Sequence, residues 1–247
     1  MVSAGRLTVV GLGPGALDQI TPEAAAALHA ADDVVGYLPY VSRAQALLAQ
    51  AGQGQAVAWH ASDNRVELER ARQALALAAQ GRQVVVVSSG DPGVFAMASA
   101  VFEAMESADA VQAAAWQALD IQVLPGITAM LAAAARAGAP LGHDFCCINL
   151  SDNLKPWPVI ARRVELAAEA DFAMAFYNPR SKSRPEGFVR LLQPQVGLFI
   201  GQLLGRAAGA RGLQVGGQVV GQLGPAAVVT LETAQLLGGV GAVMIDA

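Results

Sequence analysis

Cysteine and histidine are scarce in this 247-residue sequence, and their placement disfavours two common kinds of cross-link. The only two cysteines, Cys146 and Cys147, are adjacent, so ordinary disulfide geometry cannot join them. Metal sites need more widely spaced ligands, and the three histidines, His29, His60 and His143, show no such spacing. We therefore predict no metal site, a reducing compartment, and two cysteines that belong to a buried strand.

Charged residues and long apolar runs are also scarce. Charged residues make up 15% of the chain and leave a net charge of -4, which disfavours nucleic acid as a partner. Glycine, proline or a charged residue interrupts the apolar runs before they reach the ~18 residues of a membrane span. The opening residues, MVSAGRLTVVGLG, lack the pattern of a secretory signal. These absences predict a cytoplasmic protein with no membrane or nucleic-acid partner.

Strand-like apolar runs alternate with helical segments along most of the chain. Runs such as QVVVV and FAMAFY are apolar without alternation, which is typical of strands that helices cover on both faces. Thr21 followed by Pro22 predicts the start of the first helix. The pattern predicts an α/β fold with a mostly parallel sheet in the first half. The segment VLPGITAM at residues 123–130 predicts a boundary between domains 1–124 and 125–247.

A glycine-rich segment, VVGLGPGALDQITPE, includes the end of the first predicted strand. Gly11, Gly13 and Ala16 have the spacing of a dinucleotide-binding fingerprint, so an NAD-dependent oxidoreductase is one interpretation. That fingerprint needs a helix that starts at the second glycine and offers free N–H groups. Pro14 has no N–H, and Pro22 would interrupt such a helix. A glycine-rich turn without a ligand is the other interpretation.

The segment SSGDPGVFAMA at residues 88–98 follows the most apolar predicted strand. Ligands of parallel α/β sheets bind beyond the carboxyl ends of the strands. This end offers two serine hydroxyls, glycines that let a ligand approach the backbone, and the carboxylate of Asp91. Asp91 is equally suitable as the N-cap of the helix that follows. From these residues alone, a ligand loop and a helix cap both remain open.

Two further strand ends have comparable features. The segment PGITAM at residues 125–130 precedes an Ala-rich helix, where small side chains favour either close helix packing or contact with a flat ligand. The segment YNPRSKSR at residues 177–184 ends a predicted strand and carries three cations without an acidic neighbour until Glu186. Arginine is suited to binding carboxylates, so this segment favours an anionic ligand over a solvated loop.

Four of these segments, in this order, resemble the sequence blocks of the tetrapyrrole methylases: VGLGPG, SGDPGVF, PGITA and YNPRSKSR. The resemblance covers about residues 7–190. Members of this family transfer a methyl group from S-adenosylmethionine to carbon atoms of corrin or sirohaem precursors. The resemblance implies two α/β domains with an active-site cleft between them, a homodimer, and S-adenosylmethionine as the cofactor.

Within the family, GYLPY at residues 36–40 and LGHDFCCINLSDNLKPW at residues 141–157 are most similar to the members that act on precorrin-3B. Those members methylate carbon 17 and contract the ring in cobalamin biosynthesis. The alternatives are a cobalt-containing substrate, methylation of precorrin-4 at carbon 11, an NAD-binding oxidoreductase, or a non-catalytic tetrapyrrole-binding protein. The tail departs from the family pattern with GLQVGGQVVGQLGPAAVV, which predicts two or three apolar strands at a sheet edge or a subunit contact.

The resemblance also implies roles for individual residues. The expected cofactor contacts are Pro14, Ser89, Gly90, Asp91, Val94, Thr128, Ala129, Tyr177, Asn178 and Gly201. The expected contacts to the tetrapyrrole and its carboxylates are Gly13, Arg43, Lys155, Arg180, Lys182 and Arg184. Ring contraction requires a base and hydrogen-bond donors. The candidate base is Asp18, for which a surface role is the alternative, and the candidate donors are Tyr177 and Ser88.

Overall fold

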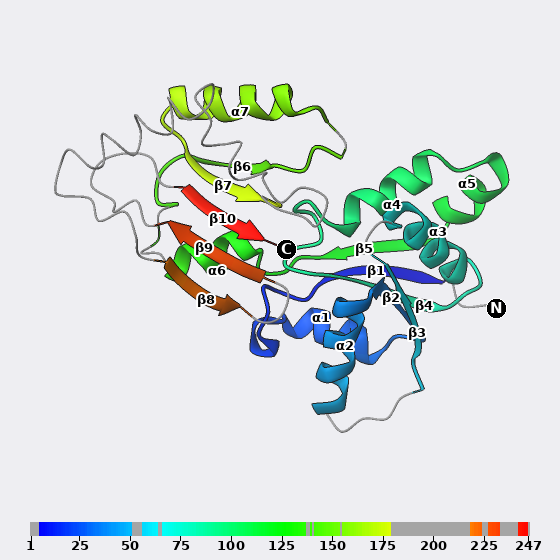
Figure 1. Cartoon of the computed structure of the whole chain (residues 1–247). Helices are drawn as coiled ribbons and strands as arrows, with labels where there is room; N and C mark the ends of the chain where they lie inside the picture. Colours follow the sequence, from blue (N-terminus) through cyan, green and yellow to red (C-terminus); the bar gives the residue numbers. More distant parts are fainter. Residues whose placement is uncertain are drawn as a thin grey trace. The chain divides into compact units, whose positions relative to one another are not determined.

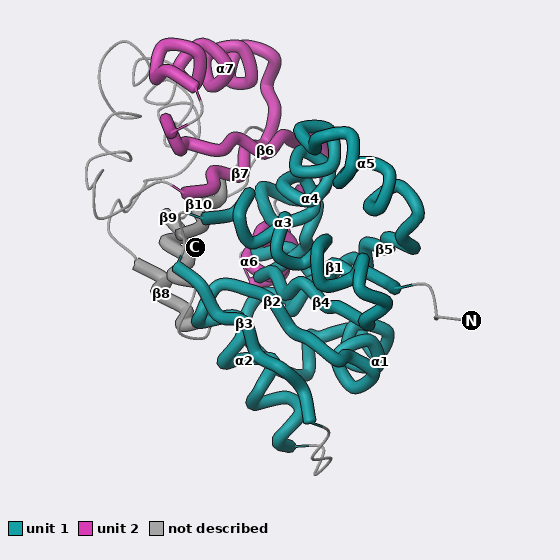
Figure 2. Tube along the Cα trace, turned by 90° about the vertical axis from the view of Figure 1, so that its right-hand side faces the viewer, with its two compact units in different colours: residues 1–129 teal, residues 130–247 magenta. Residues whose placement is uncertain are grey.

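The computed structural model in Figure 1 describes residues 5–50, 56–63, 66–136, 139, 141–153 and 155–178, and the backbone of three strands between residues 218 and 246. The chain forms two compact units, Met1–Ala129 and Met130–Ala247, which Figure 2 shows in different colours. The division lies a few residues after the predicted position, at the start of a helix rather than at the end of the preceding strand.

Unit 1 contains a five-stranded sheet in the order β3-β2-β4-β1-β5. Its strands are β1 Arg6–Gly11, β2 Asp33–Tyr37, β3 Ala58–Ser62, β4 Gln83–Ser88 and β5 Asp120–Leu124. All four pairings are parallel. Gly11 at the end of β1 pairs with Ser88 at the end of β4. Three of the four strand ends that the sequence singled out, those of β1, β4 and β5, therefore lie at one edge of this sheet.

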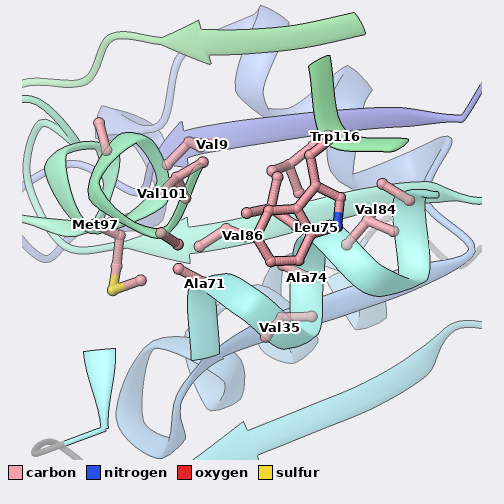
Figure 3. Close-up of a cluster of buried hydrophobic side chains, with 14 residues drawn as sticks. Val9, Val35, Ala71, Ala74, Leu75, Val84, Val86, Met97, Val101 and Trp116 are labelled. Carbon is pink, nitrogen blue, oxygen red and sulfur yellow. The ribbon is translucent and has the colours of Figure 1, made fainter. Parts of the chain in front are cut away.

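Helices cover both faces of this sheet, as Figure 1 shows: α1 Pro22–His29 and α2 Leu38–Gln50 lie on one face, and α3 Glu67–Ala78, α4 Met97–Glu106 and α5 Ala110–Gln117 on the other. Successive strand residues point to opposite faces. Val9 and Val86 therefore pack with α3 and α4 (Figure 3), while Val10 and Val87 pack with α1 and α2. This arrangement confirms the α/β class and explains why residues 84–87 of β4 are apolar without alternation.

The start of α1 is the one that the sequence predicted. The helix begins at Pro22, and the Thr21 hydroxyl accepts a hydrogen bond from the N–H of Ala24 at 3.2 Å. Proline is suited to this position because the first helical N–H has no partner within the helix. The preceding glycine-rich segment therefore leads into the short 3₁₀ helix η1 Leu17–Gln19 and not into a helix that starts at Gly13.

A buried carboxylate lies at the amino-terminal end of β2. The Asp33 side chain is 2% exposed and accepts hydrogen bonds from Arg82 Nε and, at 2.7 Å, from His60 Nε2. Burial alone would raise the pKa of Asp33, but the hydrogen bonds and charges of Arg82 and His60 outweigh it and hold the pKa below its ordinary value. The ionised carboxylate is therefore part of the stable fold.

Unit 2 contains a second five-stranded sheet in the order β6-β7-β10-β9-β8. Its strands are β6 Phe145–Asn149, β7 Ala173–Tyr177, β8 Gln218–Leu223, β9 Ala227–Glu232 and β10 Ala242–Asp246. The strands β6, β7 and β10 are parallel, and β9 pairs antiparallel with both β10 and β8. Of the two alternatives for the tail strands, a sheet edge or a subunit contact, the edge position holds for β8 but is wrong for β10, because the backbone of β10 pairs with strands on both sides.

Two helices complete the described part of unit 2: α6 Ala129–Arg136, which starts at the last residue of unit 1, and α7 Trp157–Glu169. Ile160 and Val164 of α7 pack against Ile148 and Phe176 of the sheet. Cys146 and Cys147 lie in β6 but are only half-buried, because β6 is an edge strand. Among the described residues, no helix has both the length and the apolar character to cross a membrane.

Candidate functional site

Three loops meet at the carboxyl edge of the first sheet: the Gly-rich loop (residues 12–16), the GDPG loop (residues 89–96) and the PGIT loop (residues 125–128). Gly13 and Gly90 exchange backbone hydrogen bonds of 3.1 and 2.9 Å. A Cβ atom on Gly126 would lie 2.2 Å from the Gly90 carbonyl oxygen, and one on Gly11 would lie 2.8 Å from the Gly126 Cα. The loops therefore touch backbone to backbone, and glycine is required at these contacts.

The Asp91 carboxylate links two of these loops. Its Oδ1 accepts a hydrogen bond from the Gly93 N–H at 2.8 Å, and its Oδ2 accepts one from the Gly126 N–H at 3.0 Å. The helix-cap interpretation is wrong, because α4 begins only at Met97 and its N-cap is Ala96. Asp91 thus fixes the GDPG loop against the PGIT loop.

The predicted cofactor residues of unit 1 lie next to one another. If Gly90 carried a Cβ, that atom would lie 3.5 Å from the Thr128 Cα and 3.6 Å from the Ala129 nitrogen. Val94 is half-buried in the same GDPG loop, and Pro14 is buried in the Gly-rich loop. The folded chain therefore brings together cofactor candidates that are more than a hundred residues apart in the sequence.

The two serines of the GDPG segment have different surroundings. Ser88 is 2% exposed, and its hydroxyl oxygen accepts a 3.5 Å hydrogen bond from the Met97 N–H at the start of α4. This buried position does not favour the predicted role of Ser88 as a donor to substrate. Ser89 is half-buried and shares a side-chain hydrogen bond with Tyr40 of α2. Ser89 is the serine that lies on the loop itself.

Arg43 of α2 lies beneath the Gly-rich loop rather than at the surface. It is 8% exposed, and its two terminal nitrogens donate to the carbonyl oxygens of Leu12 at 2.8 Å and Gly13 at 3.3 Å. This differs from the predicted contact with substrate carboxylates. The Gly13 carbonyl also accepts a 2.9 Å hydrogen bond from the Gly90 N–H, so the guanidinium and the GDPG loop share this oxygen. Burial lowers the pKa of Arg43, and the ionisable phenol of Tyr40 opposes this shift.

Tyr40 contacts Ser89 of the GDPG loop and is not among the residues that the sequence predicted for the site. Its ring makes an edge-to-face contact with Tyr37, with the ring centroids 5.2 Å apart. Burial and then Tyr37 raise the pKa of Tyr40, while Ser89, Arg43 and Arg70 oppose the increase. The phenol is therefore neutral at physiological pH. The sequence feature that could have indicated Tyr40 is the GYLPY segment at residues 36–40, which carries part of the family resemblance.

Asp18 lies in η1, directly after the Gly-rich loop, and is exposed. The helix α1 starts only at Pro22, so no helix N-terminus faces a ligand at the second glycine of the motif. Dinucleotide binding by the usual fingerprint depends on that N-terminus. The NAD-binding interpretation therefore has no support in the geometry of this segment.

In unit 2, the predicted residues at the end of β7 make hydrogen bonds within the unit. The Tyr177 side chain is 6% exposed, and its hydroxyl accepts a hydrogen bond from the Met130 N–H at 3.2 Å. Asn178 has a left-handed φ of 53°, and its Nδ2 donates to Asn149 Oδ1 at 3.2 Å. Lys155 is half-buried just before α7. The remaining predicted residues lie outside the described residues: Arg180, Lys182, Arg184 and Gly201.

Comparisons with known proteins place most of the chain in one family. A family model described as Tetrapyrrole (Corrin/Porphyrin) Methylases matches residues 6–199. A relative from Sinorhizobium sp named Precorrin-3B C(17)-methyltransferase is 53% identical over 209 residues, which are 83% of this chain and 78% of the relative.

Two further comparisons are informative. A Salmonella typhimurium protein named probable cobalt-factor III C(17)-methyltransferase is 44% identical over 72% of this chain and 68% of its own length. The solved structure of the methyltransferase CobJ matches with a TM-score of 0.68 and 61% identity, over 76% of this chain and 74% of that one. This chain belongs to the tetrapyrrole (corrin/porphyrin) methylases.

Proposed function

We propose that this protein transfers a methyl group from S-adenosylmethionine to carbon 17 of precorrin-3B and contracts the macrocycle, giving precorrin-4 in cobalamin biosynthesis. The observation that carries the proposal is the 53% identity to a relative named for this reaction, over most of both chains. The substrate is a small tetrapyrrole, and we further propose that the protein acts in the cytoplasm as a homodimer.

The three joined loops of unit 1 fit a sulfonium cofactor better than a dinucleotide. They offer backbone carbonyls, small residues and a single carboxylate, Asp91, whose oxygens are already fixed by two N–H groups. We assign cofactor contacts to Pro14, Ser89, Gly90, Asp91, Val94, Thr128 and Ala129 of this unit, with Tyr177, Asn178 and Gly201 as further contacts. When bound, S-adenosylmethionine supplies an electrophilic methyl group.

The chain contributes mainly by positioning. Holding two reactants in line with the reacting atoms close together supplies a large part of the rate enhancement, and a misplacement of ~1 Å costs about 100-fold. The backbone contacts among Gly11, Gly13, Gly90 and Gly126 provide this rigidity. We propose that Gly13, together with Lys155, Arg180, Lys182 and Arg184, contacts the substrate.

Ring contraction requires a group that accepts a proton. Asp18 is exposed and lies directly after the Gly-rich loop, and we propose its carboxylate as that base.

A second candidate function concerns the metal content of the substrate. The 44% identity to the Salmonella protein named for cobalt-factor III is a specific observation in favour of a cobalt-containing substrate. The two candidates are separated by offering metal-free precorrin-3B and its cobalt-containing counterpart in equal amounts. Methylation of the metal-free macrocycle alone supports the first candidate.

Isothermal titration tests the cofactor class directly. We expect S-adenosylhomocysteine to bind with one site per chain and NAD not to bind. The Asp91→Ala variant should lose affinity for S-adenosylhomocysteine. Asp109→Ala is the matched control, since Asp109 also accepts two backbone hydrogen bonds, from Val111 and Gln112 at the start of α5. Binding of NAD alone would refute the proposed function.

A further inference from the structure

The helix α2 contacts two of the three loops through one face. It follows β2 without an intervening loop, because β2 ends at Tyr37 and α2 begins at Leu38. Tyr40 and Arg43 are three residues apart in this helix, and residues at this spacing are neighbours on the helix surface. Arg43 donates to the carbonyls of the Gly-rich loop, and Tyr40 shares a hydrogen bond with Ser89 of the GDPG loop.

Arg43 is an unusual residue to bury. Arginine is almost never fully buried unless it is paired, yet no ion pair in the described part of the chain involves Arg43. The titratable group that interacts with its charge is the phenol of Tyr40 and not a carboxylate. Its Nε is buried and, among the described residues, has no hydrogen-bond partner. Removing an unpaired cation from water costs free energy. The burial of Arg43 therefore indicates that this side chain has a specific role.

The contacts of Arg43 suggest that function. Its guanidinium holds the carbonyl oxygens of Leu12 and Gly13 at 2.8 and 3.3 Å. Gly13 in turn exchanges two backbone hydrogen bonds with Gly90. A displacement of the Gly13 carbonyl is therefore transmitted to the GDPG loop, which Tyr40 contacts from the same helix.

We propose that Tyr40 and Arg43 form a brace that positions the Gly-rich loop and the GDPG loop for the cofactor and substrate. Both are positioning residues, since they act through the backbone of Gly13 and the side chain of Ser89. The nature of the ligand rests on the proposed function. The claim that α2 fixes the geometry of the two loops does not depend on the proposed function.

Arg43→Lys is the sharpest variant, because lysine keeps the positive charge but lacks the planar fork that spans two carbonyls. Arg70→Lys is the matched control. Arg70 is a buried arginine of α3, 3% exposed, whose Nε donates to the Ser62 hydroxyl at 2.8 Å and which contacts none of the three loops by a hydrogen bond. Tyr40→Phe removes the hydrogen bond to Ser89 and keeps the ring.

Two readouts separate positioning from a merely structural role. The first is amide hydrogen exchange at Gly13 and Gly90, which reports local opening of their mutual hydrogen bonds. We expect exchange about 10-fold faster in Arg43→Lys and unchanged in Arg70→Lys. The second is titration of the folded variants with S-adenosylhomocysteine. We expect affinity about 10-fold weaker in Arg43→Lys, weaker by a smaller factor in Tyr40→Phe, and unchanged in Arg70→Lys.

Each outcome decides a separate point. Unchanged exchange at both glycines in Arg43→Lys overturns the brace, whatever happens to the melting temperature. If Arg43→Lys shows faster exchange but unchanged affinity for S-adenosylhomocysteine, the claim that the brace positions the loops for the cofactor is overturned. A wild-type protein that does not bind S-adenosylhomocysteine contradicts the proposed function instead, and the exchange rates alone then decide whether α2 holds the loops.

Discussion

Gly126→Ala probes the backbone contact among the three loops with the smallest possible change. A Cβ at this position would lie 2.2 Å from the Gly90 carbonyl oxygen and 2.9 Å from the Gly11 Cα. Both atoms belong to backbone, so no rotation of a side chain relieves the overlap. The loops must separate by about 1 Å to restore van der Waals contact. That movement stretches the 3.0 Å hydrogen bond from the Gly126 N–H to the Asp91 carboxylate.

The expected magnitude follows from these two effects. Overpacking costs about 1–3 kcal/mol, and weakening a hydrogen bond to a charged group adds up to about 1.5–3 kcal/mol. We expect Gly126→Ala to lower the free energy of unfolding by about 2–4 kcal/mol. For a chain of this size, that corresponds to a melting temperature lower by at least about 4 °C. Affinity for S-adenosylhomocysteine should also fall, because the loops to which we assign the cofactor contacts have moved.

Calorimetry and titration measure both effects on the same samples. Gly142→Ala is the matched control, since the nearest atom to a Cβ at that position is 3.8 Å away, an ordinary contact. The control should melt and bind as the wild type does. A Gly126→Ala protein with wild-type melting temperature and wild-type affinity would refute the idea that these loops form one rigid unit.

Three further predictions follow from single contacts. Asp91→Ala should weaken S-adenosylhomocysteine binding more than Asp109→Ala, although both lose two backbone hydrogen bonds; equal affinities in titration would show that Asp91 has no ligand role. Asp33→Asn should cost about 1–3 kcal/mol of stability at pH 7. Because the pKa of Asp33 is held below its ordinary value, this contribution is present above pH ~4 and disappears as the pH falls through the folded pKa. Acid unfolding curves check this, and Asp120→Asn, at an exposed ion pair, should change stability by less than about 1 kcal/mol. Phe95→Asn should raise stability by about 1 kcal/mol, because Phe95 has a left-handed φ of 52° and a half-exposed ring and asparagine tolerates this backbone; thermal unfolding showing no gain would contradict it.

Much of the fold and part of the site were accessible from the sequence because they depend on local rules. Apolar runs without alternation indicated strands covered on both faces, and Thr21 with Pro22 indicated the start of α1. The carboxyl ends of parallel strands are where α/β folds place ligands. That rule picked out the loops after β1, β4 and β5, and their register brings them to one edge.

The features that escaped prediction depend on contacts between distant residues. Arg43 is recognised as buried only when its partners are known, and these are carbonyls about thirty residues earlier in the chain. Asp91 has the local pattern of a helix cap, but its partners are the N–H of Gly93 in its own loop and the N–H of Gly126, 35 residues later. The central position of β10 depends on which strands it pairs with, and composition carries no information on that.

Methyl transfer to carbon 17 is the most direct test of the proposed function. The wild-type protein is incubated with precorrin-3B and methyl-labelled S-adenosylmethionine, and the product is examined by nuclear magnetic resonance and mass spectrometry. We predict a single label on carbon 17 and a contracted ring. Label on a different carbon, or none, with an active methylase of the same family as a positive control, would contradict the proposed function.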